Sequence, residues 1–375
     1  MGNNIKCIRR RISSGKRILV TSDIHGHLNH FTQILKKAEF SDDDLLIIIG
    51  DIIEKGPESL KTLRYLMDLY KRGNVIVLAG NVDYLRLCMI EGIDSNSADD
   101  FYNYLLSQQK WTGTSIFHEM ASECGVAISS PEDILLSKDR IIEHFKSELD
   151  FLNSFPVLLE TQNYIFVHGG MPQKNLDCID SFDVYSFLKY DRFMDTDLCF
   201  DKYIVVGHWP VCLYGSDKIQ HNPIVDKRKK IISIDGGCGI KFDGQLNMIE
   251  IPDIDCDVDK IKTYSYDTLP VCKALEDQTG SADSVNILWT DNEITVLDIQ
   301  DDFTYIEHVS TGRKLWVPSD YIYKDCHCND YTTYILPVKK GDMLSVLHST
   351  SKGHIVKKEG VTGWYYGNIE YAENC

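Results

Sequence analysis

Short apolar runs alternate with amphipathic stretches through the first half of this chain, and this alternation constrains the fold more than any other feature. Such runs are typical of strands buried on both faces, and the stretches between them are typical of helices that cover a parallel sheet. The pattern predicts an α/β fold of βαβ units. The expected strands are 17–21, 45–49, 75–79, 164–167, 203–206 and 231–234, and the expected helices are 28–37 and 58–70, with Pro57 in the first turn of the second.

Five of these apolar runs are followed by side chains of the types that bind metals. Because ligands of open α/β sheets bind at the carboxyl ends of the strands, we expect these side chains to converge. Six candidates exceed what one tetrahedral ion takes, and mixed nitrogen and oxygen ligands suit manganese, iron or zinc. The sequence therefore predicts a site for two divalent cations. The candidate ligands are Asp23, His25, Asp51, Asn81, His168 and His208.

Charge and composition exclude several classes of protein. The formal net charge is -17, and an acidic surface repels phosphate backbones and anionic lipids, so we expect no nucleic-acid or membrane partner. The sequence has no apolar run of about eighteen residues, so it predicts no membrane span. Residues 1–16 lack the apolar core of a secretory signal, and we expect a solvated leader there. The 12 scattered cysteines fit reduced thiols in a cytoplasmic protein, and the one tight cluster, 326–328, is too small for a closed zinc site.

The remaining segments predict a helical insertion, a linker and C-terminal β modules. Residues 95–150 are polar, aromatic-rich and weakly helical, which favours an inserted helical cap, and 253–285 is expected to be a linker or crossing segment. Residues 286–375 show alternating short segments and a weak repeat of roughly 50 residues, in which Val296 recurs as Val346 and Trp316 as Trp364. We expect tandem SH3-like β modules, whose aromatic residues are either core or a groove for a peptide partner.

The ordered motifs SDIHG, GDIIEKG, GN, HGG, GHW and SIDGG resemble those of the calcineurin-like metallophosphoesterases. The resemblance covers about residues 16–251 and is greatest to the bacterial relatives of serine/threonine phosphoprotein phosphatases and of symmetrical diadenosine tetraphosphatases. It implies a catalytic domain over 1–252 with a four-layer αββα sandwich. It also implies two divalent ions, with manganese preferred and iron, zinc or nickel as alternatives. By motif position, Asp23, His25 and Asp51 hold one ion, and Asp51 bridges to a second held by Asn81, His168 and His208.

The mechanism implied by the resemblance is hydrolysis of a phosphate ester by a hydroxide that bridges two metals. Two adjacent cations lower the pKa of a bridging water and stabilise charge during displacement at phosphorus. Lys55 stands where the phosphatases carry an arginine, and Arg192 is the second candidate for binding phosphoryl oxygens together with Asn81. A lysine replaces a bidentate fork by a point charge, so we expect looser recognition of the individual oxygens.

The sequence departs from the phosphatase pattern at the third motif. The protein phosphatases read GNHE, whereas this chain reads GNVD, so Val82 replaces a histidine that acts as acid or donor. Glu54 stands where an aspartate partners that histidine. Because a positioned acid accelerates alkoxide departure by about 100 to 10,000-fold, its loss favours better leaving groups such as aryl phosphates and phosphoanhydrides. His27 and His118 are candidates for a substitute donor or substrate contact.

Three functions remain open from the sequence. The first is a phosphoprotein phosphatase-like hydrolase of protein or small-molecule phosphomonoesters. The second is a hydrolase of dinucleoside polyphosphates or phosphodiesters. The third is a non-catalytic metal-binding scaffold that recruits a peptide through its β modules.

Overall fold

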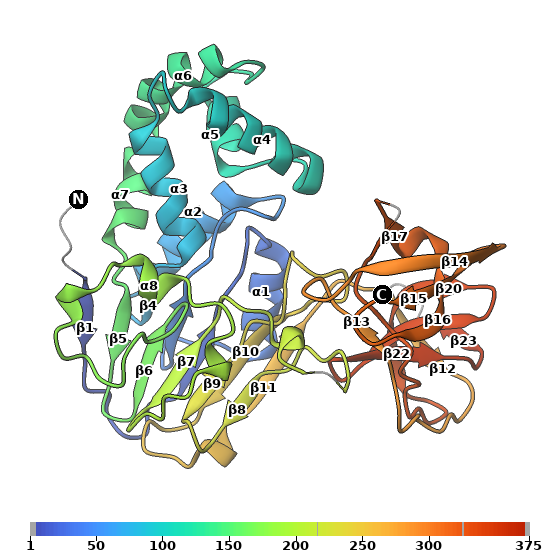
Figure 1. The fold of residues 1–375 in the computed structure, drawn as a ribbon. Helices are drawn as coiled ribbons and strands as arrows, with labels where there is room; N and C mark the ends of the chain where they lie inside the picture. The colour runs from blue at the N-terminus through green and yellow to red at the C-terminus, as the bar shows by residue number, and fades with distance from the viewer. Residues whose placement is uncertain (1–4, 216, 325, 372–375) are drawn as a thin grey trace. The chain divides into compact units, whose positions relative to one another are not determined.

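The structure is a computed structural model that describes residues 5–215, 217–324 and 326–371, and the chain forms two compact units. The first consists of Met1–Pro210 and Pro223–Asp267, and the second of Val211–Asn222 and Thr268–Cys375 (Figure 1). No helix in these described ranges has the length and apolar character needed to cross a membrane.

The described residues of unit 1 form two β-sheets. In the five-stranded sheet, ordered β11-β10-β2-β3-β4, the strands β2, β3 and β4 are parallel, as the βαβ pattern predicts. In the six-stranded sheet, ordered β1-β5-β6-β7-β9-β8, the strands β6, β7 and β9 are parallel. The strands are β1 (Cys7–Arg9), β2 (Ile18–Thr21), β3 (Leu45–Ile49), β4 (Val75–Leu78), β5 (Leu158–Glu160), β6 (Tyr164–Val167), β7 (Tyr203–Val206), β8 (Ile224–Asp226), β9 (Ile231–Ser233), β10 (Leu246–Ile251) and β11 (Lys262–Tyr266).

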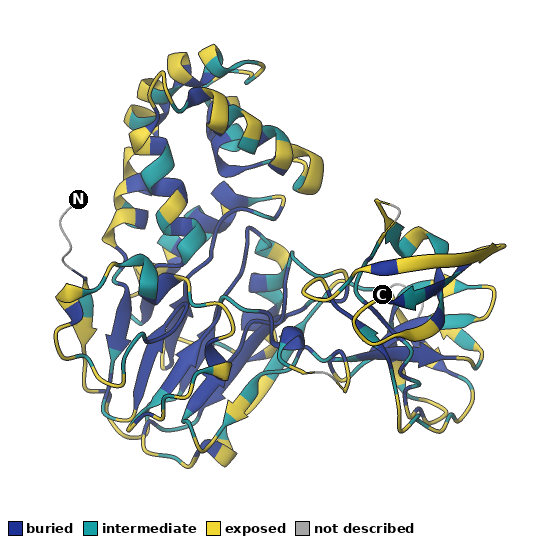
Figure 2. Ribbon diagram, in the orientation of Figure 1, coloured by how far each residue is buried: buried dark blue, intermediate teal, exposed yellow. Residues whose placement is uncertain are grey.

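The core of unit 1 lies between these two sheets. Ile47 and Ile249 from the five-stranded sheet belong to the same buried cluster as Phe166 and Val205 from the six-stranded sheet. All of these side chains are fully removed from water, which favours the folded state by roughly 1.5–3 kcal/mol for each large apolar side chain. Figure 2 shows the strands as the most continuously buried part of this unit. The expected sandwich of two sheets is therefore present.

Helices α1 (Leu28–Lys37) and α2 (Ser59–Tyr70) pack on the five-stranded sheet through their apolar sides. The expectation that Pro57 lies in the first turn of α2 is wrong, because the helix begins two residues later. The carboxylate of Glu119 accepts hydrogen bonds from Ser59 N and Leu60 N, both at 2.9 Å. This carboxylate satisfies backbone donors that a helix start leaves open.

The helical insertion is larger and more regular than the sequence predicts. Helix α6 begins with a capping box in which Ser130 Oγ accepts from Asp133 N while the Asp133 carboxylate accepts from Ser130 N, and Pro131 occupies the first turn. These local signals make the segment strongly helical despite its polar composition. The helices are α3 (Asn81–Gly92), α4 (Ala98–Thr112), α5 (Ile116–Glu123), α6 (Pro131–His144) and α7 (Lys146–Ser154).

Two other segments of unit 1 differ from expectation. Residues 5–12 are not a solvated leader, because β1 pairs in parallel with β5 and the side chains of Ile5 and Ile12 are buried; residues 1–4 of that expected leader lie outside the described part. Between β6 and β7, the described chain forms one short helix, α8 (Tyr185–Leu188), and two 3-10 turns, η1 (Ile179–Ser181) and η2 (Phe193–Asp195). The expected four-layer αββα sandwich has a layer of helices outside each sheet, and this segment supplies only these short helical turns to such a layer.

Unit 2 consists of small antiparallel sheets with an internal repeat. Strands β14, β15 and β16 form one meander, and β20, β21 and β22 form another. The second meander lies about 50 residues after the first in the sequence, as the sequence repeat predicts. Both meanders carry a register shift at the same place, at Val296/Asp298 and at Val346/His348. The strands are β12 (Val271–Ala274), β13 (Asn286–Ile287), β14 (Ile294–Gln300), β15 (Phe303–His308), β16 (Arg313–Pro318), β17 (Ile322–Tyr323), β18 (His327–Cys328), β19 (Tyr331–Thr332), β20 (Met343–Thr350), β21 (Gly353–Lys358), β22 (Val361–Tyr365) and β23 (Ile369–Tyr371).

The aromatic residues of unit 2 are divided between core and surface. Trp364 and Tyr365 are buried, and the Trp364 indole donates a hydrogen bond to Thr332 O (3.0 Å), so these two side chains belong to the core. Tyr323 and Tyr366 are exposed. The SH3-like identity of the modules and a peptide groove on them stay predictions.

A short excursion of the chain connects the two units covalently. The chain leaves unit 1 two residues after His208, spends residues 211–222 in unit 2, and returns at Pro223. Within unit 2 the backbone of this segment pairs with the chain beside and within β22. The backbone hydrogen bonds are His221 N to Gly360 O (2.8 Å) and Thr362 N to Ile219 O (3.0 Å), and the Ser284 side chain also donates from Oγ to Asp217 O (2.7 Å).

Removing residues 268–375 is expected to destabilise the remaining chain, because residues 211–222 lose these hydrogen bonds and the buried Ile219 side chain loses its cover. Calorimetry should show a lower unfolding temperature, and gel filtration should show aggregation. The full-length variant Ile219→Ser should reproduce part of the loss. A monomeric truncated chain with an unchanged unfolding temperature for unit 1 would contradict this expectation.

Candidate metal centre

The six predicted ligands converge at one edge of the unit 1 sandwich. Asp23 and His25 follow β2, Asp51 follows β3, and Asn81 is the first residue of α3 after β4. His168 and His208 follow β6 and β7, which are neighbours in the other sheet. Because these strands are parallel within each sheet, their carboxyl ends meet at one edge, as the sequence predicts.

Asp23, His25 and Asp51 form a buried cluster of potential ligand atoms that lie within 4.8 Å of one another. His25 Nε2 is 3.8 Å from Asp23 Oδ1 and 3.7 Å from Asp51 Oδ2. His25 N also donates to Asp51 O (2.9 Å), and Asp23 N donates to Gly50 O (3.1 Å), which joins the two strand-end turns. The backbone therefore fixes the relative position of these three side chains.

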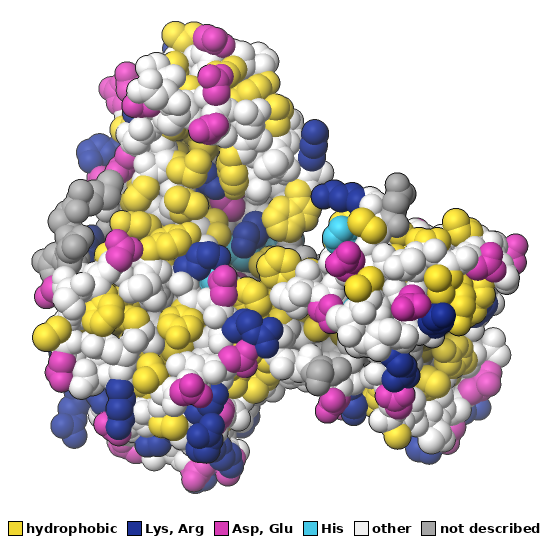
Figure 3. All heavy atoms as spheres, viewed as in Figure 1, with side chains coloured by type: hydrophobic (Ala, Val, Ile, Leu, Met, Phe, Trp, Pro, Cys, Tyr) yellow, Lys and Arg dark blue, Asp and Glu magenta, His cyan; other side chains and the backbone are white. Residues whose placement is uncertain are grey.

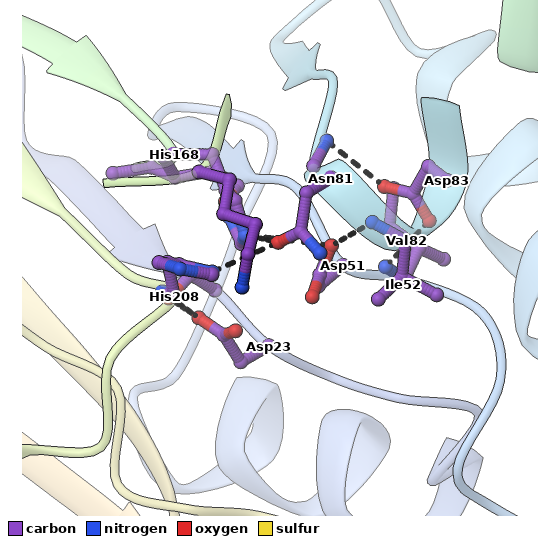
Figure 4. A network of polar contacts seen from close by, with 12 residues as sticks. Asp23, Asp51, Ile52, Asn81, Val82, Asp83, His168 and His208 are labelled. Atoms are coloured by element: carbon purple, nitrogen blue, oxygen red, sulfur yellow. Dashed lines mark hydrogen bonds and ion pairs between the residues drawn. The ribbon is translucent and has the colours of Figure 1, made fainter. Parts of the chain in front are cut away.

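The other three ligands meet at the amide of Asn81. Its Oδ1 atom lies 3.0 Å from His168 Nε2 and 2.8 Å from His208 Nδ1, and the two rings are 5.4 Å apart between centroids. His168 Nε2 is also 3.4 Å from Asp51 Oδ1, so Asp51 contacts ligands of both groups. Figure 4 shows the side chains of Asp23, Asp51, Asn81 and His208 directed toward a common centre.

The opposite nitrogens of the two histidines are held by their surroundings. His168 Nδ1 lies 2.7 Å from Ile49 O, and His208 Nε2 lies 2.8 Å from Asp191 Oδ1. A carbonyl or carboxylate in this position accepts the ring N–H and leaves the other nitrogen free of hydrogen to bind a metal. The rings are therefore oriented as metal ligands.

The backbone around the centre is strained. Asp23, His25, Asp51 and His208 all have positive φ angles, between 50° and 67°. This conformation costs about 1–3 kcal/mol for a non-glycine residue and is concentrated at functional sites. At position 207 only glycine fits, since a Cβ there would collide with the Asp23 carboxylate.

Burial and mutual repulsion dominate the electrostatics of the centre. Burial, together with the Asp51 carboxylate, raises the pKa of Asp23 to about 6, although His168 opposes the shift. Burial alone would lower the pKa of His168, but Asp51 and Asp23 raise it to about 10. Burial and the nearby Lys55 ammonium lower the pKa of His25.

These residues fit a pair of divalent cations. Asp23 Oδ1 is buried and has no hydrogen-bond partner among the described residues, which is unfavourable unless an ion or another ligand contacts it. The donors are carboxylate, amide and imidazole groups, a set that suits manganese, iron or zinc. A proton on His168 and divalent cations are two ways to balance the same buried negative charge.

The candidate phosphate-binding cations differ in position. Lys55 Nζ lies 3.4 Å from His25 Nε2, so this ammonium is beside the centre. Arg192 is half-exposed, and its Nε donates to Asp195 Oδ2 at 2.6 Å. Its neighbour Asp191 contacts His208, which places the Arg192 backbone near the centre. In Figure 3 histidine atoms are visible at the surface of unit 1 with lysine and arginine side chains beside them.

Glu54 is fully buried and forms an ion pair with Arg86, with Nε and Oε1 2.7 Å apart. Arg86 in turn stacks on Tyr104 of the insertion, at 4.1 Å from the guanidinium carbon to the ring centroid. Burial raises the pKa of Glu54, and Arg86 opposes this rise. This carboxylate connects the Asp51 loop to the insertion, and a direct catalytic role for it stays a prediction.

The candidate donors His27 and His118 lie in different surroundings. His118 is in α5, where its Nδ1 atom lies 3.0 Å from Ser115 Oγ. His27 precedes α1, and a Cβ on Gly56 would come within 2.8 Å of the His27 ring. Burial lowers the pKa of both histidines, so each favours the neutral ring. Their contact with a substrate stays a prediction.

Several residues to which the sequence motifs gave no role support the centre. Asp83 Oδ1 accepts hydrogen bonds from Ile52 N (2.9 Å) and Ile53 N (3.3 Å), and Val82 N donates to Asp51 Oδ1 (2.9 Å). Burial raises the pKa of Asp83 to about 7, and the Asp51 charge adds to this rise. Asp235, in the SIDGG motif, is also buried, and burial and the Asp23 charge raise its pKa. Only the GNVD and SIDGG motifs carried a signal for these residues.

The chain belongs to the calcineurin-like phosphoesterase family, whose model matches residues 16–234, more than half of the chain. The resemblance of the ordered motifs is therefore confirmed. This family assignment agrees with the two-sheet fold and the converging strand-end ligands.

Individual relatives share shorter or weaker similarity. A segment of 91 residues, 24% of this chain, is 40% identical to a symmetrical bis(5'-nucleosyl)-tetraphosphatase of Buchnera aphidicola subsp. Schizaphis graminum and spans only 33% of that protein's length. The protein of the same description from Chromobacterium violaceum is 23% identical over 239 residues, 61% of this chain and 71% of that protein.

Similar solved structures include a protein serine/threonine phosphatase from Saccharomyces cerevisiae. It is 12% identical, with a TM-score of 0.42, and the match covers 71% of this chain and 84% of that chain. A metallophosphoesterase from Sphaerobacter thermophilus is 16% identical, with a TM-score of 0.34, and the match covers 67% of this chain and 88% of that chain.

The variant Arg86→Leu is expected to lower the free energy of unfolding by about 3–5 kcal/mol, because it leaves the Glu54 charge buried without its partner. Urea unfolding followed by circular dichroism measures this change. The double variant Glu54→Leu, Arg86→Leu removes both charges and should recover most of the loss. Equal stabilities for the single and double variants would contradict the ion pair as the cause.

Proposed function

We propose that this chain is a metal-dependent phosphoester hydrolase with two divalent ions. The observation that carries the proposal is the convergence of six donor residues from five strand ends, with Asn81 Oδ1 within 3.0 Å of two histidine nitrogens. Structural roles alone do not explain why buried carboxylates and two oriented imidazoles lie in one place. They also do not explain why Asp23 Oδ1 is buried there with no hydrogen-bond partner among the described residues. Family membership supports the same conclusion.

In this proposal Asp23, His25 and Asp51 hold one ion, and Asp51, Asn81, His168 and His208 hold the other. When bound, the two ions supply Lewis acidity that activates water for attack on phosphorus and neutralises phosphoryl charge. The preferred metal is manganese, with iron, zinc and nickel as alternatives. Ile49 O and Asp191 keep the His168 and His208 rings in the orientation that presents the ligand nitrogen.

Lys55 supplies the protein's own positive charge for the phosphoryl group. Its ammonium is close enough to His25 to reach a substrate oxygen at the centre, and it is only half-buried, so it remains open to solvent and substrate. Arg192 is the second candidate, and in the structure its guanidinium is paired with Asp195. A flexible lysine without an arginine fork favours binding of phosphate groups of several shapes.

Position 82, where the phosphatases carry a histidine, supplies no acid for the leaving group. Valine cannot donate a proton, and the carboxylate at position 54 is engaged by Arg86. The centre therefore favours leaving groups that depart without protonation. This property supports hydrolysis of a phosphoanhydride, such as a dinucleoside polyphosphate, as a second candidate beside a phosphatase-like activity on phosphomonoesters. The similarity to tetraphosphatases of Buchnera and Chromobacterium favours that second candidate.

The variant Asp51→Asn is expected to lower turnover by about 10²–10³-fold or more and to reduce bound metal, because this side chain contacts both groups of ligands. The measurement is metal content and hydrolysis with Mn²⁺ of a phosphopeptide, an aryl monoester, an aryl diester and diadenosine tetraphosphate. Lys55→Ala should lose turnover and keep its metals. Metal binding without turnover of any substrate, with Asp51→Asn equal to the wild type, would support the scaffold alternative.

The rate of the wild-type enzyme is expected to fall steeply as the pKa of the leaving group rises, because Val82 cannot donate a proton to it. A series of aryl and alkyl phosphates measures this slope. The variant Val82→His should flatten the slope only when Arg86→Leu also frees Glu54 to support the new histidine. A shallow slope in the wild type would show that another residue donates the proton.

A further inference from the structure

A second group of side chains with potential metal-ligand atoms lies outside the Asp and His centre. His27, His30 and Cys238 each offer one donor atom, and these atoms lie within 4.8 Å of one another. His27 is the residue before α1, His30 lies in the first turn of α1, and Cys238 lies in the loop that follows β9. None of these side chains is a ligand in the proposed catalytic centre.

The start of α1 places the two histidines together. His27 stands at the N-cap of α1 and His30 is three residues further on, in the first turn, so the two side chains leave the chain close to each other. Their rings meet edge to face, with centroids 5.0 Å apart and an angle of 72° between the planes. The His30 ring also contacts the Tyr266 ring, at 5.5 Å between centroids. Aromatic contacts therefore limit where these rings can turn.

The Cys238 loop is shaped to approach the histidines closely. Gly237 and Gly239 flank Cys238 with φ angles of +75° and +72°, a conformation that favours glycine. A Cβ on Gly239 would stand 2.5 Å from His27 Nε2, so only glycine lets this loop come so near the imidazole. The Cys238 side chain itself is 2% exposed.

His27 has an unused donor or acceptor atom at this place. Its Nε2 atom is buried and has no hydrogen-bond partner among the described residues. Buried polar atoms of this kind are usually satisfied by a water, an ion or another ligand. The neighbouring thiol and imidazole make a cation the ligand that the surroundings favour.

The chemistry of this group differs from that of the catalytic centre. Two imidazoles and one thiolate form a softer ligand set, which suits zinc and leaves one position of a tetrahedron open to water. Zinc at its usual bond lengths needs donor atoms about 3.4–3.6 Å apart, so the side chains have to close by at most about 1.4 Å. Binding replaces the thiol proton of Cys238, which is released to water.

We propose that His27, His30 and Cys238 form a third cation site of the zinc type, separate from the two-metal catalytic centre. The ion joins the start of α1 to the loop after β9. Because His27 is two residues after His25, this ion also restrains the turn that presents a catalytic ligand. The proposal does not depend on the substrate of the enzyme.

Cobalt(II) titration of the full chain tests this site, since cobalt bound by a thiolate gives a strong sulfur-to-metal charge-transfer absorption and the catalytic centre contains no cysteine. The wild type should bind three ions per chain and show this absorption. Cys238→Ser should bind two ions and lose the absorption, and His30→Gln should weaken it at least tenfold at equal cobalt. Unchanged absorption in Cys238→Ser, or equal stoichiometry in Cys238→Ser and the wild type, would overturn the proposal.

Two control variants test whether the absorption comes from Cys238. Cys326→Ser removes a cysteine whose Sγ lies 3.0 Å from His327 Nδ1 in unit 2, and it should leave the absorption unchanged. Asp51→Asn should lower cobalt binding at the catalytic centre and keep the absorption. Loss of the absorption in either control would place the thiolate signal elsewhere and would overturn the proposal. Failure of catalysis alone leaves these readouts unaffected.

Discussion

The burial of several carboxylates in one place is the constraint on which the rest of this structure depends. Asp23, Asp51 and Asp235 are almost completely removed from water. In addition to burial, the Asp51 charge raises the pKa of Asp23, and the Asp23 charge raises the pKa of Asp235. Burying unpaired charge is costly, so such a group persists only where cations, protons or hydrogen bonds balance it. The two divalent ions that we propose for this site would provide that balance and also the chemistry, so the buried carboxylates fit a metal centre better than a purely structural element.

The fold satisfies this constraint by fixing the backbone rather than by packing side chains. Left-handed conformations at the strand ends turn the ligands inward, and glycine at position 207 admits the Asp23 carboxylate. Hydrogen bonds from Ile52 N and Ile53 N to Asp83 hold the Asp51 turn, and the Arg86–Glu54 ion pair joins that turn to the insertion. The strain of the turns is offset by the large apolar core between the two sheets.

Features with local causes could be predicted from the sequence, and features with distant partners could not. The strand β3 and the helix α1 have the predicted bounds because apolar runs and helical spacing are local. The ligands follow from them because parallel strands share an edge. The pairing of β1 with β5, the Arg86 partner of Glu54 and the excursion of 211–222 into unit 2 join residues far apart in the chain, so no local pattern encodes them.

The central claim is that six strand-end residues hold two divalent ions. Anomalous X-ray diffraction from crystals of the full chain grown with Mn²⁺, recorded on both sides of the manganese absorption edge, tests it most directly. We predict two manganese peaks that share Asp51 as a ligand, one beside Asp23 and His25 and the other beside Asn81, His168 and His208. A single peak, or manganese bound elsewhere with these residues hydrogen-bonded only to one another, would contradict this claim.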